Sequence, residues 1–217
     1  MTREFVLATH NAGKVAEFQR LFDASGLDVR VLEYDGPAPA ETGTSFAENA
    51  LIKARAAAEH TGTIALADDS GLCVAVMGGA PGIFSARWAG SSASDQANRS
   101  LLLEQLADIA EPDRAAAFHC ELALVVLAEH DPAGRGGELT VAGRWDGQIA
   151  REEAGEFGFG YDPVFIPDGF AISAAELRPE VKSEHSHRAR AFEQLRSLLA
   201  ELFGPELAAN APVGAER

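Results

Sequence analysis

Short apolar segments alternate along this 217-residue chain with segments whose apolar residues recur at helical spacing. The first apolar segment, 5–8, is typical of a buried strand, and Val15, Phe18 and Phe22 then recur with the period of a helix. Strands that alternate with helices favour a sheet covered by helices. The alternation therefore predicts an α/β fold with a mixed sheet.

Later segments extend this pattern. Ser45 and Glu48 form a capping box that predicts a helix to about His60. Two short apolar segments, 64–67 and 72–76, are expected to flank a turn at 68–71. The other predicted elements are a helix over 94–106, a strand over 115–127, its hairpin partner over 139–145 and a final helix around 192–202.

The length of the chain allows one sizeable core, as one large domain or as two small lobes closed on a cleft, and we favour one core with a cleft. We predict a single domain over residues 1–207. Residues 208–217 show no periodicity and are predicted to form a mobile tail.

Charge and composition limit the partners. The formal net charge is −15, so the surface repels nucleic-acid phosphates and no nucleic-acid partner is expected. The first residues lack a signal-peptide layout and no apolar stretch reaches membrane-spanning length, so we expect no membrane partner and a cytoplasmic location. Cys73 and Cys120, the two cysteines, lie in apolar runs, which fits buried thiols in a reducing compartment.

Two adjacent carboxylates, Asp68 and Asp69, precede Ser70 and Gly71 at the predicted turn. Carboxylates at the end of a strand suit a hard divalent cation. Because successive strand side chains point to opposite faces, only one should face a ligand. We predict that Asp69 binds metal or activates water while Asp68 braces the loop. The alternative is that both acids only cap the turn.

A donor-rich loop joins the first strand to the first helix. Its backbone amides and the positive helix end suit phosphate oxygens, and a chain of net charge −15 needs a local cation or metal for an anionic substrate. The alternative is a solvated lysine at a helix start, since the loop is not a P-loop. The loop comprises Thr9, His10, Asn11, Ala12, Gly13 and Lys14.

Three further features are weaker in isolation. Glu41 is an acid in a Pro/Gly-rich loop, where acids are usually only solvated. The segment 155–163 packs glycines between aromatics, so Phe159 could stack on a base, or could belong to the core. The segment 182–188 carries several potential cations, among them Arg188, which could offer a planar fork to a phosphate or base edge, or could be surface charge.

Taken in order, six segments closely resemble the inosine triphosphate pyrophosphatase family, also called XTP/dITP diphosphatases. The likeness runs from about Phe5 to Leu202, and the ordered set is far more specific than any one motif. The segments are Thr9–Lys14, Glu41–Gly43 with Phe46–Ala50, Ala67–Leu72, Gly79–Arg87, Gly158–Pro163 and Ser186–Arg188.

The resemblance implies a homodimeric α/β enzyme with a long central mixed sheet flanked by helices, and two lobes that enclose a substrate cleft. It implies Mg²⁺-dependent hydrolysis of purine nucleoside triphosphates, namely ITP, dITP and XTP, to the monophosphate and pyrophosphate. Residues 9–14 would hold the phosphates, Glu41 and Asp69 would bind Mg²⁺, and Asp69 would also accept a proton. The other substrate-binding residues would be Ser70, Phe159, Gly160, Tyr161, Asp162, Lys182, His187 and Arg188.

The sequence departs from the usual family pattern at His10, Ser183 and Ala189, and none of these departures removes a proposed catalytic group. Two rival functions remain open. One is a Maf-type pyrophosphatase that acts on pyrimidine or methylated nucleotides, although such enzymes usually open with a Ser-rich, arginine-bearing loop. The other is a non-enzymatic nucleotide-binding module, in which the acids would serve only the fold.

Overall fold

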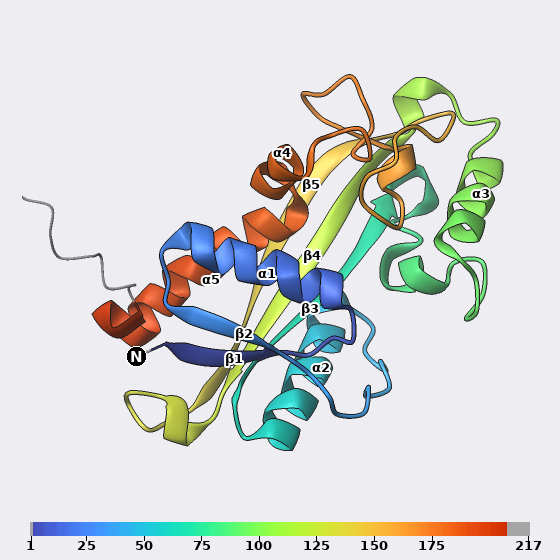
Figure 1. Ribbon diagram of the computed structural model, residues 1–217. Coiled ribbons are helices and arrows are strands. Elements are labelled where there is room, and N and C mark those ends of the chain that lie inside the picture. Colours follow the sequence, from blue (N-terminus) through green and yellow to red (C-terminus); the bar gives the residue numbers. More distant parts are fainter. Residues whose placement is uncertain (1, 208–217) are drawn as a thin grey trace, which may run out of the picture. The chain divides into compact units, whose positions relative to one another are not determined.

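The computed structural model describes residues 2–207. Within them, six strands form one sheet in the order β2-β1-β3-β4-β5-β6 (Figure 1). β1 runs parallel to β2 and β3, whereas β5 and β6 are antiparallel, so the predicted α/β fold with a mixed sheet is confirmed. The strands are β1 Arg3–Leu7, β2 Val29–Glu33, β3 Ile64–Val74, β4 Ala115–Val126, β5 Gly137–Ile149 and β6 Phe165–Pro167. The α-helices are α1 Ala12–Ser25, α2 Phe46–Thr61, α3 Asp95–Gln105, α4 Pro179–His185 and α5 His187–Phe203.

The chain divides into two compact units. Among the described residues, the first unit contains 2–68, 122–141 and 192–207, and the second contains 69–121 and 142–191. The assignment of residues 1–207 to a single domain stays a prediction, and the predicted tail at 208–217 lies outside the described residues. Among residues 2–207, no helix combines the length and apolar character that crossing a membrane requires.

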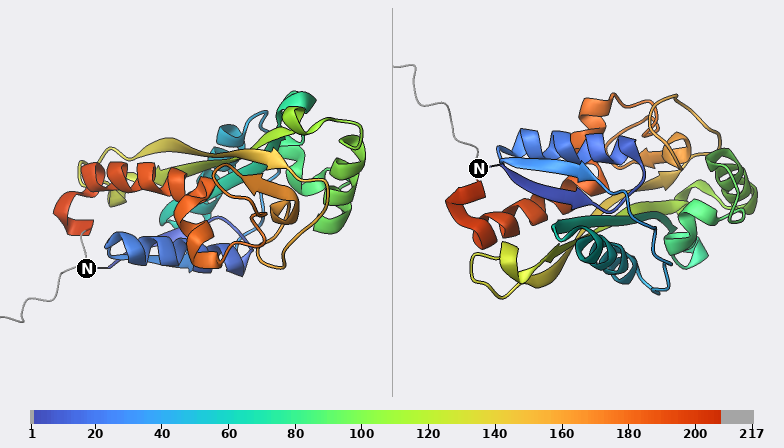
Figure 2. Two further views of the ribbon diagram at one scale, coloured as in Figure 1. Left: turned by 90° about the horizontal axis from the view of Figure 1, so that it is seen from above. Right: turned by 60° about the horizontal axis from the view of Figure 1, so that its bottom comes forward.

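The first unit is built on β1, which is buried from Phe5 to Leu7. α1 and α2 cover opposite faces of the strands in this unit (Figure 2). α1 packs through Phe22, whose ring lies 5.7 Å from that of Phe5 and 4.9 Å from that of Phe192. α2 packs through small side chains, which let the helix approach the sheet closely: Ala50, Ala54, Ala57 and Ala58.

The second unit has its own core around Trp145 and Phe165 of β5 and β6, whose rings lie 5.6 Å apart. Phe118 of β4 meets Phe165 edge to face at 4.7 Å. Leu102 and Leu106 bring α3 onto the same cluster. Buried aromatic and aliphatic area of this kind is the main stabilising contribution to such a unit.

The predicted turn at 68–71 is wrong. β3 continues without interruption from Ile64 to Val74, and Gly71 is buried within it. The sequence Asp-Asp-Ser-Gly favours a turn locally, but β3 pairs with β1 over residues 64–66 and is a neighbour of β4 in the sheet, and incorporation into the sheet outweighs that preference. The Lys14 ammonium also offsets the charge of Asp68 inside the strand.

Other element boundaries also differ from the prediction. The hairpin strand predicted over 139–145 is longer, because β5 runs from Gly137 to Ile149. Two strands, β2 and β6, carried too weak a pattern to be predicted. The basic segment 182–188 is not a loop, because it belongs to α4 and to the first turn of α5.

Candidate active site

The first unit contains a cavity of about 240 Å³ on the loop between β1 and α1. Four predicted site residues, Thr9, His10, Lys14 and Glu41, line it together with Asp68. The structure therefore brings the predicted phosphate loop and one predicted metal ligand to the same cavity.

Lys14 and Asp68 form a bidentate ion pair in this cavity. The Lys14 ammonium lies 2.8 and 2.9 Å from the two carboxylate oxygens of Asp68. The Asp68 side chain is only 1 % exposed, and that of Lys14 is 20 % exposed. A carboxylate this deeply buried stays ionised only with a close cationic partner. The prediction that Asp68 braces a turn at 68–71 is therefore wrong, and its carboxylate instead holds the Lys14 ammonium.

Asn11 caps α1 and determines how the loop amides are used. Its Oδ1 accepts hydrogen bonds from the amides of Gly13 at 2.9 Å and Lys14 at 3.3 Å. The Asn11 amide donates in turn to Thr9 Oγ1 at 3.2 Å. The loop therefore holds its shape through internal hydrogen bonds, and an anion at the helix start would share the Gly13 and Lys14 amides with this cap.

A second ion pair joins Glu41 to Lys53 of α2, with 3.1 Å between Oε1 and Nζ. Both side chains are largely buried, at 29 % and 15 % exposure. Lys53 could not be predicted from the sequence, because nothing local in the sequence of α2 separates it from an ordinary helix lysine. The pair fixes the Glu41 carboxylate at the cavity wall.

Among the described residues, no group of three or more His, Cys, Asp and Glu side chains is placed to hold a metal ion. Mg²⁺ usually takes only one or two carboxylates from a protein and completes its octahedron with waters and substrate phosphates. Glu41 and Asp69 each carry hard carboxylate oxygens of the kind that Mg²⁺ accepts from a protein.

Asp69 and Ser70 are half-buried in the middle of β3 and belong to the second unit. Their place in a regular strand differs from the turn that was predicted. A strand holds side chains more rigidly than a turn, which favours a positioned catalytic carboxylate.

The glycine-aromatic loop of the second unit presents Phe159 to solvent, with 46 % of the residue exposed. The Lys182 ammonium and the Arg188 guanidinium carbon each lie 5.3 Å from its ring centroid. Both cations lie over the ring, and the part of the ring that they leave exposed is a surface on which a flat base could stack. Phe159 is thus not part of the core, which was the alternative interpretation.

Tyr161 and Asp162, which follow in the same loop, are buried. Asp162, 2 % exposed, accepts the Phe159 amide at 2.8 Å and the Lys182 ammonium at 2.5 Å. The Tyr161 hydroxyl donates to the Ser85 carbonyl at 2.8 Å, and burial raises the pKa of this phenol, which keeps it neutral. Both side chains hold the loop in shape.

The interpretation of His187 and Arg188 as surface charge is wrong. They are 3 % and 4 % exposed at the start of α5. The His187 ring stacks on Phe118 at 4.9 Å with an interplanar angle of 13°. Phe118 is far away in sequence, so the local cluster of charges gave no sign of this burial.

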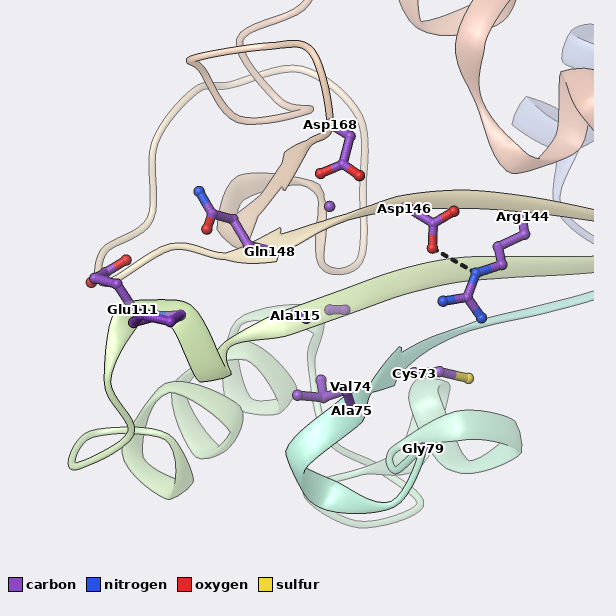
Figure 3. Close-up of a pocket in the computed structure, with 13 residues that line it drawn as sticks. Cys73, Val74, Ala75, Gly79, Glu111, Ala115, Arg144, Asp146, Gln148 and Asp168 are labelled. Atoms are coloured by element: carbon purple, nitrogen blue, oxygen red, sulfur yellow. Dashed lines mark hydrogen bonds and ion pairs between the residues drawn. The ribbon is translucent and has the colours of Figure 1, made fainter.

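The second unit also contains a larger cavity of about 490 Å³, shown in Figure 3. Arg144 on its wall pairs with Asp146 at 2.6 Å, and burial raises the pKa of the Cys73 thiol. None of the predicted site residues lines this cavity. Its size alone therefore does not make it the active site.

The family is decided by a comparison with known proteins. The model of the Ham1 family matches residues 5–198, nearly the whole chain. The chain belongs to the Ham1 family. The resemblance predicted from six motifs is confirmed.

Ham1 relatives match over almost their full lengths. A protein of Leifsonia xyli subsp. xyli named dITP/XTP pyrophosphatase is 55 % identical over 92 % of this chain and 97 % of its own. A Streptomyces coelicolor protein of the same name is 49 % identical over 94 % of this chain and 100 % of its own. The solved structure of a HAM1 protein from Coxiella burnetii covers 92 % of this chain and 99 % of its own, with 44 % identity and a TM-score of 0.80.

Proposed function

We propose that this chain is a nucleoside triphosphate pyrophosphohydrolase that converts ITP, dITP and XTP to the monophosphate and pyrophosphate, and so removes deaminated purines from the nucleotide pool. The observation that carries this proposal is membership of the Ham1 family, which includes a relative named dITP/XTP pyrophosphatase that is 55 % identical over 97 % of its own length. The site chemistry supports it. We place the reaction in the cytoplasm, where that pool is used.

Residues 9–14 would bind the triphosphate. Lys14 supplies the cation that a chain of net charge −15 needs near an anionic substrate. Asp68 holds the ammonium in place before substrate arrives, which reduces the ordering cost of binding. The start of α1 adds backbone amides and the positive end of the helix.

Glu41 and Asp69 would hold Mg²⁺, which when bound offsets phosphate charge and polarises the reacting phosphoryl group. Asp69 would accept a proton from the attacking water. The water oxygen forms a bond to the α-phosphorus, the bond from that phosphorus to the α,β-bridging oxygen breaks, and pyrophosphate leaves with the electron pair. The monophosphate retains the new oxygen.

The base would stack on Phe159, with Ser70, Lys182, His187 and Arg188 completing the substrate contacts. Hypoxanthine and xanthine carry a 6-oxo acceptor where adenine carries an amino donor. A protein donor aimed at that oxygen would be left unpaired by ATP, at a cost of about 1 to 3 kcal/mol. Arg188 is the best placed candidate, because its guanidinium lies beside the Phe159 ring.

A pyrophosphate-release screen over ITP, XTP, dITP, ATP, GTP and UTP with Mg²⁺ tests the proposal. Release from the first three alone supports it. A preference for UTP would indicate a Maf-type enzyme, and binding without release a non-enzymatic module. Guanine shares the 6-oxo group, so GTP tests recognition at the 2-position.

Arg188→Ala is expected to narrow the preference for ITP over ATP by about 1 to 3 kcal/mol, since a lost donor penalises the base that used it. Arg188→Lys should restore only part of the preference, because lysine lacks the planar fork. The measurement is kcat/KM for both nucleotides in the wild type and both variants. Equal proportional losses for ITP and ATP would instead assign Arg188 to the phosphates.

We further propose a homodimer that forms through the segment around 78–83. Val76 and Phe84, which flank it, are each 49 % exposed, and a twofold contact would remove this apolar surface from water. Light scattering at micromolar concentration should give twice the chain mass, and Val76→Asp with Phe84→Asp should give the monomer. Ile172→Asp, a similar change at another exposed apolar residue, is the matched control. A wild-type monomer would refute the dimer.

A further inference from the structure

Helix α3 is a fixed platform within the second unit. Asn98, 2 % exposed, accepts the Ala89 amide at 2.7 Å and donates to the Ala86 carbonyl at 3.2 Å. Just beyond the other end of the helix, the Leu106 carbonyl accepts a hydrogen bond from the buried Arg114 guanidinium. Leu102 packs in the core between these points. The helix is therefore held at both ends without help from the glycine-aromatic loop.

Two side chains on one face of α3 form hydrogen bonds with the backbone of Gly160 in the glycine-aromatic loop. Asp95 Oδ2 accepts the Gly160 amide at 2.8 Å, and Arg99 Nη1 donates to the Gly160 carbonyl at 2.8 Å. Residues four apart lie on one face of a helix, so both groups reach the same point. Together they fix the two peptide groups on either side of Gly160, and each hydrogen bond is strengthened by a charge.

The backbone at this point needs such support. Gly160 has a φ of +61°, in the left-handed region that glycine enters freely and also leaves freely. The Arg99 side chain is 14 % exposed and also pairs with Glu153 at 2.9 Å, so it is itself held in place. Asp95 is exposed, so its hydrogen bond contributes less than that of Arg99.

These hydrogen bonds are made to Gly160, the residue that directly follows the exposed Phe159. Asp162 accepts a hydrogen bond from the backbone amide of Phe159, and Asp95 accepts one from the backbone amide of Gly160. The peptide groups before and after Phe159 are therefore both held. With both neighbouring peptides fixed, the direction in which the Phe159 ring leaves the backbone is fixed as well. The ring then stands beside Lys182 and Arg188, each 5.3 Å from its centroid.

We propose that Asp95 and Arg99 are positioning residues that hold the Gly160 peptides, and through them the Phe159 ring, in the orientation that receives the nucleobase. The inference rests on the proposed function, because it assigns the base platform of that same reaction. The hydrogen bonds from Asp95 and Arg99 to Gly160 should affect binding of the base. They should not affect binding of the triphosphate or the reacting groups, so base recognition and phosphate recognition can be measured separately.

The test compares two substitutions with their conservative counterparts. Arg99→Met should raise KM for XTP and dITP about fivefold to tenfold, and Asp95→Ala about twofold to fourfold, with kcat within about twofold of wild type. Arg99→Lys and Asp95→Asn retain a donor or an acceptor and should recover part of the loss. The Ki of inorganic triphosphate, which has no base, should stay unchanged in all four variants.

Glu104→Gln is the matched control, because it neutralises an exposed acid on the same helix and should behave as wild type. Hydrogen exchange adds a readout independent of turnover: exchange of the Gly160 amide should accelerate in Asp95→Ala and not in Glu104→Gln. Unchanged KM despite faster exchange would overturn the inference, and so would an equal rise in the Ki of triphosphate. A wild type that hydrolyses no nucleotide would instead refute the proposed function.

Discussion

Asp69→Asn is expected to lower the turnover of XTP and dITP by at least about a hundredfold while the fold stays intact. Asparagine keeps the shape of the side chain in β3 but removes the negative charge and the ability to accept a proton. The loss should fall on kcat, because the missing group acts on the attacking water. Steady-state kinetics of the purified variant, beside its thermal unfolding curve, measure both parts.

Asp108→Asn is a suitable control for this substitution. Asp108 is an exposed acid of the same unit, and its neutralisation changes the net charge by the same amount. It should leave turnover at the wild-type level. Near-normal turnover in Asp69→Asn would remove Asp69 from the catalytic role.

Lys14→Ala is expected to weaken the use of every nucleoside triphosphate alike, by about 1.5 to 3 kcal/mol, because the ammonium meets phosphate and not base. The structure adds a second effect. The Asp68 carboxylate, 1 % exposed, loses its bidentate cation, which should lower the free energy of unfolding by about 3 kcal/mol. Kinetics and urea unfolding must therefore be measured together.

A double variant separates the two effects. Lys14→Met with Asp68→Asn removes both charges of the buried pair, so it should recover most of the lost unfolding free energy, as neutral replacements of buried ion pairs often do. Nucleotide use should stay impaired, because the cation is still missing. A double variant with restored activity, or a loss confined to one base in Lys14→Ala, would contradict the phosphate role.

The boundaries of α2 and α3 could be predicted from the sequence, whereas α4 was not predicted and α5 begins at His187, before the expected range of 192–202. The helix expected from Ser45 to about His60 is α2, Phe46–Thr61. Its start is determined locally, because Ser45 Oγ accepts the Glu48 amide at 3.2 Å, and its end is determined by Gly62 in the left-handed conformation. Signals of this kind lie within a few residues of the boundary that they determine.

Strands depended more on distant parts of the chain. The turn predicted at 68–71 was wrong, since Asp68 is balanced by Lys14, 54 positions away, and β3 pairs with neighbours on both sides. β6 has three residues, too few to show a period, and β2 is an edge strand of five. Pairing partners are a property of the fold, which no short window of sequence contains.

In the candidate site, too, the local motifs could be predicted from the sequence, whereas contacts between distant elements could not. The motifs predicted that the phosphate loop and Glu41 belong to one function, and the structure places Thr9, Lys14 and Glu41 on one cavity. The contacts that hold these groups could not be predicted, because Lys53 and Asp68 come from other elements. The hydrogen bonds from Asp95 and Arg99 to Gly160 could not be predicted from the sequence either, although a spacing of four residues places both side chains on one helix face.

A single mixed incubation tests the central claim most directly. Equal amounts of dITP, dATP and dGTP are given to the purified protein with Mg²⁺, and the products are separated by ion-exchange chromatography over time. We expect dIMP and pyrophosphate to appear together in equal amounts while dATP and dGTP persist. Consumption of all three nucleotides at similar rates, or release of orthophosphate with dIDP in place of pyrophosphate with dIMP, would contradict the proposed function.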